Sequence, residues 1–152
     1  MRTTNAPDFD LSSLSGERKT LAGLLASGPV VLAFFKVTCP TCQLTFPFLE
    51  RLHQGGKARI VAISQDDAAA TSNFNQRFGV TFTTLLDPKD NGYRVSNAYR
   101  ITDVPTLFVV EPDGSVSHTV AGFDKATLDS LAGRFTTPVF TSQDRVPIFR
   151  PG

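Results

Sequence analysis

Three largely apolar runs dominate the hydrophobic pattern of this 152-residue chain, at residues 29–35, 59–64 and 106–110. Each run is short and rich in β-branched or aromatic side chains, a pattern typical of strands buried on both faces. Weaker strands are predicted at residues 83–86 and 116–120, the second returning from a hairpin turn at Glu111-Pro112-Asp113-Gly114. The chain therefore carries enough strands for one central sheet.

Apolar residues at helical spacing lie between these strands. The longest such segment begins at Cys39-Pro40, where Cys39 is the expected N-cap and Pro40 the first helical residue, and it ends at Gly55-Gly56. Its apolar stripe comprises Leu44, Phe48, Leu49 and Leu52. Its expected solvent side comprises Glu50, Arg51, His53 and Gln54. Pro47 is expected to kink this helix.

Shorter helices are predicted on both sides of that segment. Leu21, Leu24 and Leu25 indicate one helical turn. Asp66-Asp67 is expected to cap a helix that carries Phe74 and Phe78. A short helix is expected at residues 95–99. Asp124 is expected to cap a last helix, whose apolar stripe runs to Phe135.

The order of elements predicts the fold class. Strands and helices alternate, and a hairpin and a final helix follow, which indicates an α/β fold with a mixed central sheet flanked by helices. We expect one domain over residues 1–152, with a core at about 6–135 and an aperiodic, proline-containing C-terminal tail at 136–152.

Composition and charge exclude several classes. The net charge of +1, from 15 basic and 14 acidic residues, argues against a nucleic-acid surface. No apolar stretch approaches the roughly 18 residues that span a bilayer. The N-terminal residues 1–8 contain no apolar signal region, so the expectation is a cytoplasmic protein, with a periplasmic or secreted one as the alternative if the chain is a mature or trimmed form.

Cys39 and Cys42 are the only cysteines, and they are separated by Pro40 and Thr41. The loop that a disulfide between them closes is too small to restrain the unfolded chain much, so a redox or metal role is favoured over a structural one. A closed metal site needs further ligands, and His53 and His118 are the only other soft ones. We therefore expect a redox-active dithiol and no metal or cofactor.

The expected position of the pair assigns a role to each sulfur. The unpaired N–H groups and positive dipole of a helix N-terminus favour a thiolate on Cys39, and Lys36 adds positive charge if it points toward the sulfur. Cys42, one turn into the helix, is expected to be buried. Cys39 then attacks a disulfide, and Cys42 resolves the mixed disulfide. Phe46, one turn further on, is a candidate lining residue of an apolar substrate groove.

The motifs together resemble the thioredoxin superfamily, in particular its TlpA/ResA-like branch within the redoxin (AhpC-TSA) group of thiol-disulfide oxidoreductases. The matching segments within residues 6–135 are Ala6-Pro7-Asp8-Phe9, residues 30–42, Leu85-Leu86-Asp87-Pro88, Asn97-Ala98-Tyr99, Val104-Pro105-Thr106-Leu107-Phe108 and Glu111-Pro112-Asp113-Gly114. The resemblance implies a thioredoxin-like fold with an N-terminal extension and a central insertion.

The resemblance also implies site residues beyond the cysteines. The Val104-Pro105 bond is expected to be cis and to bring the Val104 backbone beside the sulfurs, where it pairs with an extended substrate segment. Thr38, Pro40 and Thr41 are the other expected substrate contacts. A disulfide- or thiol-containing protein, a redox partner that recycles the pair and a monomeric state are the implied partners and assembly.

Three positions depart from the family pattern. Thr38 replaces the usual Trp, Ala33 replaces a polar residue beneath the disulfide, and Thr45 replaces a Glu. Both usual proton acceptors for Cys42 are thus absent, which leaves water, Lys36 or the substrate. Lys36 and Thr45 are the candidates for tuning the cysteine pKa values, and the couple is expected to be reducing or intermediate.

Two alternatives remain from the residues alone. A peroxiredoxin-like thiol peroxidase requires a Pro-x-x-x-Thr/Ser-x-x-Cys pattern, but Lys36 and Cys39 occupy the Thr/Ser position before the two cysteines. A copper chaperone that uses the cysteine pair requires a wider gap and a positioned histidine. Thiol-disulfide exchange is the favoured activity.

Overall fold

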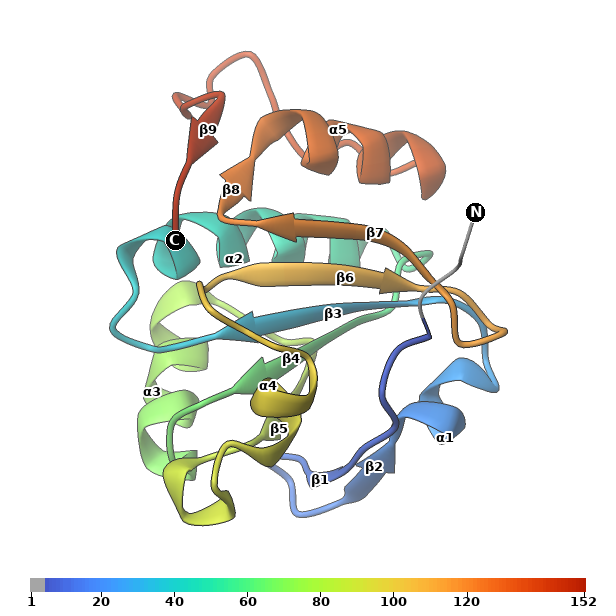
Figure 1. Cartoon of the computed structure of the whole chain (residues 1–152). Coiled ribbons are helices and arrows are strands. Elements are labelled where there is room, and N and C mark those ends of the chain that lie inside the picture. The colour runs from blue at the N-terminus through green and yellow to red at the C-terminus, as the bar shows by residue number, and fades with distance from the viewer. Residues whose placement is uncertain (1–4) are drawn as a thin grey trace.

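The computed structural model describes residues 5–152, so part of the N-terminal segment at residues 1–8 lies outside the described residues. A five-stranded sheet in the order β5-β4-β3-β6-β7 forms its centre (Figure 1). The strands are β3 (Val30–Phe35), β4 (Ile60–Ser64), β5 (Thr83–Leu86), β6 (Thr106–Val110) and β7 (Val116–Ala121). β3, β4 and β5 are parallel, whereas β6 and β7 are antiparallel to their neighbours, so the sheet is mixed as predicted.

Helices cover both faces of this sheet. They are α1 (Leu21–Leu25), α2 (Pro40–Gln54), α3 (Ala68–Phe78), α4 (Arg94–Ala98) and α5 (Lys125–Arg134), with a 3-10 turn η1 at Lys89–Asn91. The predicted caps are confirmed at Cys39 for α2 and Asp124 for α5. For α3 the cap is Asp67, which leaves Asp66 outside the helix. α2 continues through Pro47 without interruption.

Two small sheets lie outside the central one. β1 (Asp10–Ser12) and β2 (Arg18–Thr20) form the N-terminal hairpin. β8 (Phe123–Asp124) pairs with β9 (Phe149–Arg150), so the tail returns to the body of the molecule. Figure 1 shows the C-terminus beside the start of α2.

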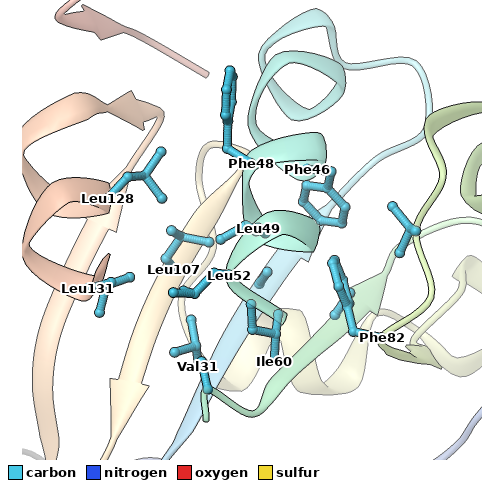
Figure 2. Packing of buried hydrophobic residues seen from close by; sticks show 14 of the residues in the cluster. Val31, Phe46, Phe48, Leu49, Leu52, Ile60, Phe82, Leu107, Leu128 and Leu131 are labelled. Atoms are coloured by element: carbon cyan, nitrogen blue, oxygen red, sulfur yellow. The ribbon is translucent and has the colours of Figure 1, made fainter. Parts of the chain in front are cut away.

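The alternating faces of β3 divide the core into two clusters. Val31, Ala33 and Phe35 contact the cluster that α2, α3 and α5 cover, whereas Val30, Leu32 and Phe34 face α1 and α4. Figure 2 shows Leu49 and Leu52 of α2 lying on the side of Leu107 and of the α5 residues Leu128 and Leu131, whereas Phe46 lies toward Phe82. This burial fixes α2, and with it the cysteines, against the ends of the strands.

Two sequence-based expectations about α2 are wrong. Phe46 does not line a groove, because it is fully buried against Phe35, Phe74 and Phe82. Glu50 does not face solvent: only 9% of it is exposed, and its carboxylate accepts hydrogen bonds from the Thr81 N–H at 2.8 Å and hydroxyl at 2.6 Å. Burial alone raises the pKa of Glu50, but these bonds lower it overall. A carboxylate satisfied by the chain before β5 can stay on a buried helix face.

Candidate active site

Cys39 is the last residue of the loop that joins β3 to α2. It has an extended backbone (φ −82°, ψ 115°), and its Sγ accepts a hydrogen bond from the Cys42 N–H at 3.1 Å. Pro40 follows as the first helical residue, where its missing N–H leaves no hydrogen bond unmade. The Cys39 side chain therefore caps the helix and stays partly exposed, and it receives one of the free N–H groups that favour a thiolate.

The loop before β6 brings a main-chain carbonyl to this sulfur. The Cys39 thiol donates to the Val104 carbonyl oxygen at 3.2 Å, and the Val104-Pro105 bond is cis, as predicted. Antiparallel pairing of β3 with β6, in which Phe34 lies opposite Thr106, places the two loops at the same end of the sheet. Sheet register thus joins segments that lie far apart in the sequence.

Cys42 has a different environment. It is fully buried and belongs to the core cluster beneath α2. Burial is the main reason why the pKa of Cys42 lies far above its usual value. A hydrogen bond between the Cys42 and Cys39 side chains and the charges of Cys39 and Asp66 raise this pKa further. A main-chain hydrogen bond from Lys36 acts in the opposite direction. Cys42 is therefore a protonated, protected thiol at neutral pH, and the two cysteines are free rather than bonded.

Asp66 is the site residue that sequence reasoning missed. Its Oδ2 accepts a hydrogen bond from the Val37 N–H at 2.8 Å, which places the carboxylate against the loop that leads to Cys39. The Asp66 N–H donates a hydrogen bond to the Ser64 hydroxyl oxygen at 3.0 Å. A signal existed: Asp66 follows β4, and the carboxyl ends of neighbouring parallel strands meet at one edge of a sheet.

The other predicted site residues lie around the pair in different ways. Thr38, Pro40 and the Lys36 side chain are exposed. Thr41 is buried and its hydroxyl donates to the Pro151 carbonyl at 2.7 Å. Thr45 is also buried, but its hydroxyl donates to the Thr41 carbonyl one turn back, at 2.7 Å.

Within residues 5–152, no three His, Cys, Asp or Glu side chains lie close enough to hold a metal ion. None of the helices in that same part has the length and apolar character that crossing a bilayer requires.

Several known proteins are similar to this chain. The profile of the AhpC/TSA family matches residues 3–119. The thiol-disulfide oxidoreductase ResA of Bacillus subtilis (strain 168) is 32% identical over 123 residues, which are 78% of this chain and 66% of that protein. The chain thus spans about two thirds of that relative's length.

Solved structures give the same picture of the fold. The thioredoxin domain of a thiol-disulfide oxidoreductase from Bacteroides vulgatus superposes with a TM-score of 0.77 at 18% identity, over 89% of this chain and 99% of that one. A secreted Mycobacterium tuberculosis disulfide oxidoreductase, described as homologous to Escherichia coli DsbE, gives 0.69 at 26% identity, over 84% and 94%.

Fold, cysteine spacing and relatives together define a thiol-disulfide oxidoreductase with a thioredoxin-like fold. The chain belongs to the AhpC/TSA family.

Proposed function

We propose that Cys39 is the nucleophile of a thiol-disulfide exchange and that Cys42 is the resolving thiol. The observation that carries this assignment is the contrast between the two sulfurs. Cys39 is partly exposed, caps a helix and lies beside the Val104 carbonyl, whereas Cys42 is buried behind it. An attacking thiolate must reach the substrate, and the resolving thiol needs only to reach Cys39.

The proposed exchange takes place in two steps. The Cys39 thiolate attacks one sulfur of a substrate disulfide, forms a mixed disulfide and releases the other substrate sulfur, which takes a proton. The Cys42 thiolate then attacks the Cys39 sulfur, closes the Cys39–Cys42 disulfide and releases the second substrate thiol. Two electrons pass from the protein to the substrate, and a reduced dithiol partner must return them before the next cycle.

The second step requires Cys42 to lose its proton, which its raised pKa opposes. We propose that Asp66 accepts this proton. Its carboxylate is held near the pair by the Val37 N–H, and its charge acts on Cys42. A nearby carboxylate that receives the proton as the attack proceeds fits the requirement of a general base. Asp66 thereby replaces the family's usual acceptors, which are absent at Ala33 and Thr45.

The substrate in this proposal is a disulfide carried by a protein. Val104 and Pro105 supply the loop beside Cys39, and Thr38, Pro40 and Thr41 surround the sulfur. Pairing with the main chain of Val104 selects an extended backbone rather than a particular side chain. The balanced charge offers no nucleic-acid surface. We further propose that residues 6–135 form the catalytic core of a single monomeric domain.

The cellular compartment decides how the cysteine pair is kept reduced. One structural relative is described as secreted, and an oxidising compartment demands a dedicated reductant for the pair. Fractionation of the producing cells, with thiol alkylation of each fraction, locates the protein and reports whether Cys39 and Cys42 are reduced there.

Reduction of insulin disulfides by dithiothreitol, with and without the protein, tests the activity. Cys39→Ser is expected to abolish the acceleration. When reduced Cys42→Ser is mixed with insulin in the absence of dithiothreitol, it is expected to accumulate a mixed disulfide with the substrate, visible on a non-reducing gel, because no second thiol of the protein resolves it. Equal activity of Cys39→Ser and the unchanged protein contradicts the assignment. Consumption of hydrogen peroxide faster than insulin reduction favours the peroxidase instead.

A further inference from the structure

The last four residues of the chain lie across the site just described. We call residues 149–152 the C-terminal strap. Phe149 and Arg150 form β9, which pairs with β8, and the Lys125 N–H extends this pairing to the Ile148 carbonyl at 2.9 Å. The strap then continues to the start of α2, where Thr41 donates its hydroxyl to Pro151 at 2.7 Å (Figure 1).

The strap approaches the backbone beside Cys39 without room for a side chain. A Cβ on Gly152 would lie 2.1 Å from the Val104 carbonyl oxygen, the atom that accepts the Cys39 thiol. It would also lie 3.1 Å from the Val104 nitrogen. On the neighbouring side a Cβ on Gly122 would lie 2.4 Å from the Arg150 oxygen. Glycine at both positions lets one extended backbone lie flat against two loops.

The tail is held firmly before the strap and weakly within it. Arg51 binds the Asp144 carboxylate through two nitrogens, at 2.7 and 3.1 Å, and donates to the Val139 carbonyl at 2.9 Å. Val139 is buried in the core cluster. By contrast, Phe149 in the strap is 54% exposed and Ile148 just before it is 81% exposed, so little apolar area holds the strap in place. A segment anchored at its base and lightly held at its end can leave without unfolding the domain.

We propose that the C-terminal strap is an internal ligand of the active site, and that a polypeptide substrate must displace it to reach Cys39. This inference rests on the proposed function, because it concerns the same groove. The strap covers Val104, occupies the Thr41 hydroxyl and runs as an extended backbone, so it fills the space that an extended polypeptide needs. A small disulfide, which needs only the Cys39 sulfur, competes with it less.

The strap therefore lowers the apparent affinity for a polypeptide in proportion to the closed fraction of molecules. If the strap is open in about one molecule in ten, its removal raises the apparent affinity for a polypeptide about tenfold. A small disulfide gains less, because it does not use the backbone surface of Val104. The ratio of the two rates isolates the strap from any general change in the reactivity of Cys39.

Two variants and one control test this role. Deletion of residues 149–152 removes the strap, and Gly152→Ala places a methyl group where the Val104 carbonyl lies. Gly133→Ala is the matched control, because a Cβ there meets nothing within 4 Å. We expect the deletion to raise kcat/KM for insulin about tenfold and for hydroxyethyl disulfide less than twofold. Gly152→Ala should move the ratio in the same direction, and Gly133→Ala should leave it unchanged.

An unchanged or lower insulin rate in both strap variants, with melting temperatures that show folded protein, overturns the proposal. So does an equal gain for both disulfides, because it means that the strap merely shields the sulfur. Failure of the proposed function is separable: alkylation of Cys39 requires no turnover. Deletion should speed modification by a peptide-linked maleimide about tenfold more than modification by iodoacetamide, and equal gains contradict the strap's role even in an inactive protein.

Discussion

The Cys39 sulfur lies 3.2 Å from the Val104 carbonyl oxygen, although 65 positions separate the two residues in the sequence. The contact exists because β3 and β6 pair antiparallel and bring the loop after one strand beside the loop before the other. In the proposed function it gives the nucleophile Cys39 a main-chain neighbour on which an extended substrate can align.

The two cysteines should differ sharply in alkylation. In the folded, reduced protein, iodoacetamide is expected to modify Cys39 and to leave Cys42 unmodified, because burial keeps Cys42 hidden and raises its pKa. Mass spectrometry of peptides after timed alkylation measures both sites. Denaturation before alkylation is the control and should make both sites react. Equal modification of Cys42 in the native protein contradicts the assignment.

The raised pKa of Cys42 also predicts that the stability of the fold depends on pH. An unfolded Cys42 ionises near pH 8.5 to 9, whereas the folded one stays protonated. The unfolded state therefore loses a proton that the folded state keeps, so the stability of the reduced protein should fall as the pH rises above about 9. Urea denaturation between pH 7 and 10 measures this, and Cys42→Ala should reduce the slope. An identical slope in that variant assigns the effect elsewhere.

Asp66→Asn should slow the resolving step. The Asn oxygen can still accept from the Val37 N–H, so the loop is kept while the charge and the base are lost. We expect mixed-disulfide resolution to slow by about 10- to 100-fold, at the low end of general-base effects, and its pH profile to change. Quenched-flow alkylation follows the intermediate. Asp67→Asn is the matched control, since asparagine also caps α3. A normal rate and profile in Asp66→Asn excludes the role.

Glu111 and Arg134 should make the fold acid-sensitive. Arg134 donates to the Glu111 carboxylate at 2.7 and 2.8 Å and lowers its pKa to about 2. A lowered pKa stabilises the fold above the unfolded value near 4.5, and this contribution is lost as the pH falls toward 2. The pair is partly exposed, so we expect about 1 kcal/mol or less. Denaturation of Glu111→Gln should show a smaller acid loss, whereas the exposed-site control Glu17→Gln should behave like the unchanged protein.

The redox couple should be reducing or intermediate. A strongly oxidising pair needs extra stabilisation of its reduced form. Here one N–H donates to Cys39, Cys42 is a buried thiol and the Lys36 side chain is exposed. We therefore expect a potential below about −200 mV in a glutathione titration. A value near about −120 mV contradicts this expectation.

The sequence by itself determined much of the framework. Continuous apolar runs and helical spacing predicted β3, β4, β6 and the helices, because burial on one or two faces sets those periods. The spacing of Cys39 and Cys42 after a strand and at a helix start indicated the chemistry. The family resemblance of residues 104–108 correctly implied the cis bond. These features follow from the sequence because they depend on residues close to one another along the chain.

Only the tertiary structure decided which distant groups share the site. Periodicity placed Glu50 on the solvent side, but the chain before β5 covers it and satisfies its carboxylate. The sequence predicts Asp66 as part of a helix cap, but the order of the strands brings its carboxylate against the Val37 N–H. The tail gave no periodic signal, yet it lies on Thr41 and Val104. These contacts depend on sheet register and on long-range hydrogen bonds, whose partners no local pattern encodes.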